Sequence, residues 1–150
     1  MDLISYKADK NDILEIEKVL EKLVLSTYID LALVGDEGGR LLAFVSPDIK
    51  DEKEASRFSV VCAGVLGALD QLNHIIHEKN NFFTEGINKS IYIKISQHKF
   101  FIASIFDRKV PLGSVKLFTD KALSNLEPIF EKIRNNKSEN LNIKFDMLEF

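Results

Sequence analysis

Residues 52–78 contain no proline and repeat apolar side chains at the three- and four-residue steps of a helix. Asp51, followed three residues later by Glu54, resembles a helix N-terminal capping pair, and His77 lies where the helix dipole favours it. We therefore predict one long helix over 52–78. We expect one apolar stripe of this helix to face a sheet. This stripe comprises Phe58, Cys62, Val65, Leu69, Leu72 and Ile76.

The opposite side of this predicted helix is small and nearly uncharged, whereas the outer side of a surface helix normally carries charge. It comprises Ser56, Val60, Ala63, Gly64, Gly67, Gln71 and His74. A glycine inside a helix costs about 1 kcal/mol relative to alanine, and the close approach of another backbone would explain that cost. Either a second copy of the chain packs here across a two-fold axis, or another segment of the same chain, such as a helix over 10–26, covers this side.

The first half of the chain also predicts a helix and a hairpin. The helix is expected over about 10–26, with Asp9 or Asn11 as its N-cap. Strands over 28–34 and 40–46 flank the sequence Asp-Glu-Gly-Gly at 36–39, whose glycines supply the positive φ of a tight turn. These two strands are predicted to pair antiparallel.

The second half predicts three more strands and a third helix. Residues 80–88 are expected to form a loop, and strands are expected over 90–95, 100–106 and 110–119. The third helix either begins near Asn125, with Pro128 in its first turn, or is kinked at Pro128. Residues 135–140 are expected to be a polar linker, and residues 141–150 a short edge strand or a docking tail.

The element order is therefore α-β-β-α-β-β-β-α, in a chain whose 150 residues are the size of one domain. Because hairpins dominate the connections, we predict an α+β fold with a five-stranded, mainly antiparallel sheet. We expect the helix over 52–78 to cover one face of this sheet and the other two helices to cover the other.

No motif in the sequence assembles a catalytic centre. There is no Walker A loop and no Gly-x-Gly-x-x-Gly fingerprint. His74 and His77 are three residues apart, but neither Cys62 nor a carboxylate at a fitting spacing completes a metal site. A net charge of −3 argues against a nucleic-acid binder. We predict a protein that is not an enzyme and uses no metal or cofactor.

We also expect no secretory signal. The N-terminus has no basic region followed by an apolar stretch. The uncharged run over 58–69 is shorter than the roughly 20 residues that a membrane-spanning helix needs. We expect a cytoplasmic protein without direct membrane insertion.

The hairpin and the element order resemble the roadblock family of dynein light-chain-type domains. Residues 31–43 read as an apolar strand, Asp-x-x-Gly and a second apolar strand, and a long helix rich in small residues follows at 55–76. The resemblance covers about residues 10–134, and Pro128 departs from the family pattern. It implies a profilin-like sandwich as a domain over 1–134, with 135–150 as a linker and a C-terminal strand or tail.

The same resemblance implies a dimeric scaffold that binds and regulates a Ras-like small GTPase. The partner in the dimer would be a second copy or a related roadblock subunit. Two copies of the helix over 52–78 would pack side by side, and strand 90–96 would pair with its symmetry mate through Ile91, Tyr92 and Ile93.

The sequence leaves open how a bound GTPase would be regulated. The nucleotide site belongs to the GTPase, and Arg40, Arg57 and Arg108 are equal candidates for an arginine that reaches it. The alternative function is a longin-like trafficking module or a small-molecule sensor, with a pocket near Gly64 and Gly67.

Overall fold

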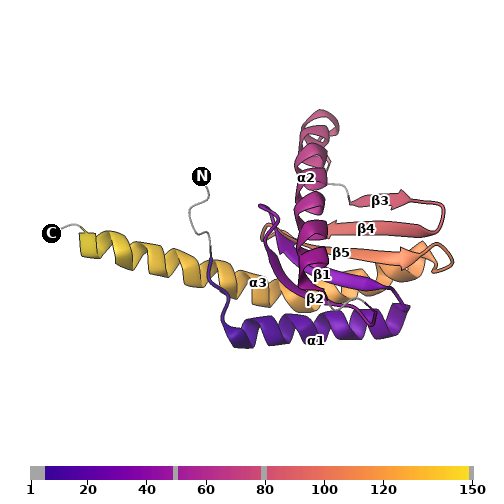
Figure 1. Ribbon diagram of the computed structural model, residues 1–150. Helices are drawn as coiled ribbons and strands as arrows, with labels where there is room; N and C mark the ends of the chain where they lie inside the picture. Colours follow the sequence, from indigo (N-terminus) through magenta and orange to yellow (C-terminus); the bar gives the residue numbers. More distant parts are fainter. Residues whose placement is uncertain (1–5, 49–50, 79–80, 149–150) are drawn as a thin grey trace.

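Eight helices and strands follow one another in the predicted order (Figure 1). The computed structural model describes residues 6–48, 51–78 and 81–148, with side chains described as far as residue 136. The elements are α1 (Lys10–Thr27), β1 (Leu31–Asp36), β2 (Leu41–Val45), α2 (Glu52–Ile76), β3 (Phe82–Glu85), β4 (Lys89–Ile95), β5 (Phe100–Asp107) and α3 (Leu112–Leu148). The predicted α+β class with a five-stranded sheet is confirmed.

The sheet has the strand order β2-β1-β5-β4-β3, and every neighbouring pair is antiparallel. β1 and β2 form the predicted hairpin. β5 pairs with the other side of β1, which places these two strands at the centre of the sheet, where all six residues of β1 are buried. β2 and β3 are the two edges.

The helices form one layer on each face of the sheet, as predicted (Figure 1). Successive side chains of a strand point to opposite faces. Ala32 and Val34 of β1 accordingly pack with α1 and α3, and Leu31 and Leu33 pack with α2. Since α1 lies across the sheet from α2, α1 does not cover the small-residue side of α2.

Local signals explain where α1 begins and ends. The Asp9 carboxylate accepts the backbone N–H of Asp12 at 2.8 Å, and the Asp12 carboxylate accepts the N–H of Asp9 at 3.3 Å. This reciprocal capping box fixes the first turn. Tyr28, in the left-handed conformation with φ of 60°, ends the helix, so β1 begins at Leu31 instead of residue 28.

Two predictions for the second half of the chain are wrong. The expected loop at 80–88 contains β3, a short edge strand that exists because it pairs with β4. The expected strand at 110–119 is the beginning of α3. Val115 and Thr119 are β-branched, as strand residues often are, but together with Leu123 and Leu126 they form the buried stripe of a helix.

The C-terminal predictions also need correction. α3 begins at Leu112, well before Asn125, and Pro128 lies inside it on an exposed side. α3 continues to Leu148, where the sequence predicts a linker over 135–140 and a strand or tail over 141–150. A helix nucleated by packing extends at little cost, because each further residue adds one hydrogen bond. Residues 149–150 lie outside the described residues, and a domain boundary near 134 stays a prediction.

Candidate functional site

The Asp-x-x-Gly turn between β1 and β2 is built against α2. One oxygen of the Asp36 carboxylate accepts the backbone N–H groups of Gly38 and Arg40, both at 2.9 Å. Gly39 has φ of +90°, and a Cβ there would lie 2.8 Å from the Cα of Val60. The glycine is therefore needed both for the turn and for the approach of the α2 backbone.

Gly35 brings β1 equally close to α2. A Cβ at Gly35 would lie 2.3 Å from the Ser59 hydroxyl oxygen and 2.5 Å from the Phe101 ring. Ser59 is fully buried, as are Ala55 and Cys62 on neighbouring turns. The two glycine contacts and these three small residues hold the N-terminal half of α2 against the sheet.

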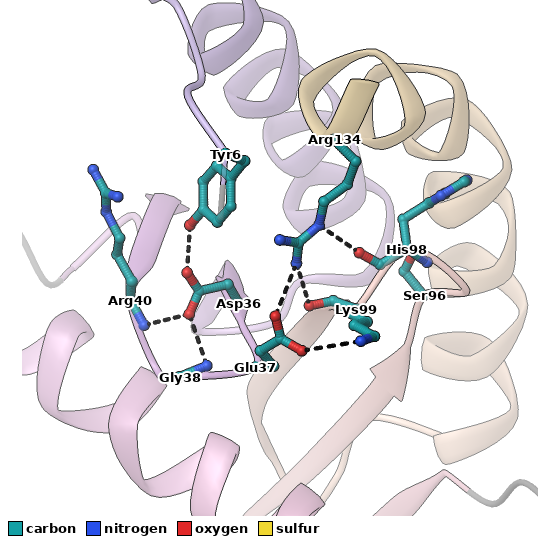
Figure 2. A network of polar contacts seen from close by, with 9 residues as sticks. All are labelled: Tyr6, Asp36, Glu37, Gly38, Arg40, Ser96, His98, Lys99 and Arg134. Atoms are coloured by element: carbon teal, nitrogen blue, oxygen red, sulfur yellow. Dashed lines mark hydrogen bonds and ion pairs between the residues drawn. The ribbon is translucent and has the colours of Figure 1, made fainter. Parts of the chain in front are cut away.

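A polar network fixes the other side of the same turn (Figure 2). The hydroxyl of Tyr6 donates to the second carboxylate oxygen of Asp36. Burial and this contact raise the pKa of Tyr6 well above its usual value. The guanidinium of Arg134, from α3, lies 4.8 Å from the centre of the Tyr6 ring and 4.3 Å from that of Phe100.

Arg134 also joins the two turns at this end of the sheet (Figure 2). Its guanidinium donates to the carbonyl oxygens of His98 at 2.9 Å and Lys99 at 3.1 Å, and lies 3.6 Å from the Glu37 carboxylate. The charged groups of the network therefore hold one another, and they join the β1–β2 turn and the β4–β5 turn to α3.

The three candidate arginines lie in different environments. Arg40 has its guanidinium 5.5 Å from the centre of the Tyr6 ring, and Arg108 pairs with Glu85 at 3.4 Å. Arg57 is exposed on α2. The structure does not bring these three side chains together.

The C-terminal half of α2 is largely uncovered. No described residue from Ala63 to Ile76 is buried, because α2 contacts mainly β1 and β2 and its last turns extend beyond these strands (Figure 1). The predicted sheet-facing stripe is thus only half right. Cys62 is buried, but Leu72 is 45% and Ile76 is 42% exposed.

The predicted small-residue side of α2 faces outward. A Cβ at Gly64 or Gly67 would have no neighbour within 4 Å among the described residues. Val60 is 58% exposed, and Gln71 and His74 are exposed, whereas Ser56 and Ala63 are half-buried. We call the uncovered part of the helix the α2 surface, and it comprises Val60, Val61, Gly64, Gly67, Leu72, Ile75 and Ile76.

The predicted role of strand 90–96 is wrong, because β4 is paired with β5 on one side and with β3 on the other. Tyr92 and Ile93 are core residues, and Tyr92 points to the α1–α3 layer. Ile91 is half-buried on the α2 face, where Phe82 and Ile105 are also only partly covered. The free edge on this side of the sheet belongs to β3, which the sequence analysis missed.

The candidate reactive residues are not arranged for chemistry. His74 is exposed and lies 3.7 Å from the Asp70 carboxylate. Within the described ranges, no three His, Cys, Asp or Glu side chains gather as metal ligands would. Cys62 is 1% exposed, and burial raises the pKa of its thiol to about 12.

We predict that Cys62 resists thiol reagents in the folded protein. The thiolate is the reacting species, and at pH 8 a pKa of about 12 leaves almost none of it. Labelling with 5,5′-dithiobis(2-nitrobenzoate) should be complete in 6 M guanidinium chloride and at least tenfold slower without denaturant. Equal rates in the two conditions would contradict the buried position.

By length and composition, α2 is also apolar enough to cross a membrane. It has 25 residues with a mean hydropathy of 1.3 in its most apolar stretch. Such a helix fits equally well a protein surface that a partner covers. The N-terminal half of α2, packed on the sheet through Ala55, Ser59 and Cys62, favours that second explanation.

Comparisons with known proteins identify the fold. No protein-family model matches the chain. An uncharacterized protein of Aquifex aeolicus (strain VF5) is 29% identical over 152 aligned positions, covering 99% of this chain and 93% of its own.

Solved structures give the clearest similarity. Myxococcus xanthus MglB superposes with a TM-score of 0.75 at 25% identity, over 85% of this chain and 96% of its own. A structure described as MglB with tetrameric arrangement gives 0.79 at 20% identity, over 89% and 99%. A roadblock/LC7 domain from Streptomyces avermitilis gives 0.66 at 12% identity, over 75% and 94%.

Proposed function

The chain has the roadblock-family fold, and on that premise we propose that it is a non-catalytic dimeric scaffold of the cytoplasm that binds and regulates a Ras-like small GTPase. The observation that carries the proposal is the uncovered α2 surface. Val61 and Ile75 are 62% and 74% exposed, and a Cβ at Gly64 or Gly67 would meet no described atom within 4 Å. Contiguous apolar surface of this kind marks an interaction site.

A second copy of the chain is the occupant that fits this surface best. Two α2 helices approach closely where Gly64 and Gly67 leave their backbones bare, and Val60 and Ile75 become buried. A two-fold axis makes the same patch serve both copies. A related roadblock subunit with a similar helix would fit in the same way.

The edge strand β3 supports the same assembly. Among the described residues β3 pairs only with β4, so its outer N–H and C=O groups are free for another strand. Pairing with β3 of the second copy would remove this exposed edge, which is otherwise an aggregation hazard. β3 thus takes the role that the sequence predicts for strand 90–96.

The GTPase would meet a surface made by both copies. The sequence offers no phosphate loop, and the polar groups around Asp36 are engaged with one another. Regulation would therefore act by positioning the catalytic groups and the water of the GTPase itself.

The test titrates Ras-like GTPases of the source organism against this protein by calorimetry, each loaded with GDP or a non-hydrolysable GTP analogue. We expect one nucleotide state to bind the wild type and to bind Gly67→Arg at least tenfold more weakly. Gly113→Arg is the matched control, because Gly113 is also open but lies at the start of α3. Binding to no GTPase, or equal binding to a monomer, would refute the proposal.

A further inference from the structure

A groove of about 580 Å³ lies between α1 and α3, on the side of the sheet opposite the α2 surface. Val19, Phe118 and the buried Ala122 form its apolar floor. The exposed side chains of Lys18, Lys22 and Lys121 form its rim, with the hydroxyl and amide groups of three further residues. Ligand sites of small molecules are typically about 300–1,000 Å³ and combine an apolar lining with a few polar groups.

All the charged side chains that line the groove are positive. Its lining includes three lysines and no carboxylate, in a chain whose net charge is −3. Across the described residues, none of these lysines has an acidic partner within 4.0 Å. By contrast, the nearby Lys94 and Lys132 are paired with Asp120 at 2.8 Å and Asp12 at 3.0 Å.

A cation–π contact joins the rim of the groove to its floor. The ammonium nitrogen of Lys121 lies 5.1 Å from the centre of the Phe118 ring, so a positive charge and an aromatic surface meet inside the groove. Lys18 and Lys22 are one turn apart on α1 and so present two ammonium groups from the opposite wall. Three positive charges around one groove raise its electrostatic potential and so favour an anion there.

We propose that this groove binds a soluble amphiphilic anion, with one carboxylate, sulfonate or phosphate group on a compact apolar body. The anionic group would sit among the three ammonium groups and the apolar body over Val19, Phe118 and Ala122. The volume favours a single compact molecule. The groove's volume of about 580 Å³ lies within the range of small-molecule sites.

This site goes beyond the scaffold function and is independent of it. The groove and the α2 surface lie on opposite faces of the sheet, so a dimer formed through α2 leaves both grooves open. Ligand binding should therefore be the same in Gly67→Arg as in the wild type, although that variant loses GTPase binding.

The probes are 1-anilinonaphthalene-8-sulfonate and its neutral analogue N-phenyl-1-naphthylamine, titrated by fluorescence against the dimeric protein at low salt. Lys22→Gln/Lys121→Gln should bind the sulfonate at least about tenfold more weakly and the neutral amine within twofold of the wild type. Lys53→Gln/Lys109→Gln, which removes two exposed lysines elsewhere, should bind both probes like the wild type. Unchanged sulfonate binding in Lys22→Gln/Lys121→Gln, equal loss of both probes, or an equal loss in the control variant would overturn the proposal.

Competition distinguishes the source of the anion. 1-Naphthyl phosphate should displace the sulfonate, and inorganic phosphate at the same concentration should not. In two-dimensional NMR, the titration should shift the amide signals of Val19 and Ala122. Displacement of the sulfonate by inorganic phosphate would mean that the groove binds a free ion. Sedimentation with phosphatidylglycerol vesicles, without displacement by 1-naphthyl phosphate, would mean that it binds a membrane surface.

Discussion

Replacing Gly67 by arginine is expected to convert the proposed dimer into a monomer. The folded chain has room for the side chain, because a Cβ at Gly67 meets no described atom within 4 Å. In the dimer the same arginine would lie between two α2 helices, where an unpaired charge loses its hydration without compensation. We expect the dissociation constant to rise at least about 100-fold, which is roughly 2.7 kcal/mol. Light scattering should then give the 17.1 kDa mass of one chain.

Two variants control this experiment. Gly113→Arg adds the same side chain at another open glycine and should keep the mass of the wild type. Gly67→Ala should raise the stability of the isolated chain by up to about 1 kcal/mol, because alanine favours a helix, and still weaken the dimer. A dimer of unchanged affinity in Gly67→Arg would show that α2 is not the interface.

Local signals in the sequence account for the features that it predicts correctly. The helical period of 52–78 and the Asp-x-x-Gly turn depend on neighbours within a few residues. The outward position of Gly64 and Gly67 also follows from that period. The extent of the sheet beneath α2 does not, so Leu72 and Ile76 were expected to be covered and are exposed.

The errors fall where tertiary contacts decide the structure. Phe82–Glu85 has no clear alternation and becomes a strand because β4 lies beside it. Without β3, β4 would be the edge strand of the sheet, which is why the sequence predicts that strand 90–96 pairs with a second copy. Val115 and Thr119 favour a strand by propensity, yet their burial against α1 and β5 makes them part of a helix.

The network around Asp36 lay beyond sequence reasoning for a related reason. Tyr6, Asp36 and Arg134 are distant in the chain, so no spacing connects them. The sequence predicts only that Asp36 belongs to a turn. The same holds for the groove, whose lysines come from α1 and α3 and meet only after those helices pack.

The close contact between β1 and α2 leads to the second large effect, at Gly35. Gly35→Ala should lower the free energy of unfolding by about 1–3 kcal/mol, as overpacking of a core usually does. The added methyl group would lie 2.3 Å from the Ser59 hydroxyl oxygen and 2.5 Å from the Phe101 ring, so both side chains must move. Urea unfolding at fixed protein concentration measures the change, and Gly113→Ala, at an open position, should stay within about 0.5 kcal/mol of the wild type.

A double-mutant cycle of Gly35→Ala and Ser59→Ala tests the contact between β1 and α2 directly. The hydroxyl of Ser59 is buried and has no hydrogen-bond partner among the described residues, so Ser59→Ala should be neutral or stabilising. Removing that oxygen also removes the nearest clash, and Gly35→Ala should therefore be less costly in the Ser59→Ala background, by about 1 kcal/mol in a double-mutant cycle. The remaining cost should come from Phe101. Additive effects of the two substitutions would mean that β1 and α2 are not in contact at this point, and the orientation of α2 on the sheet would then be wrong.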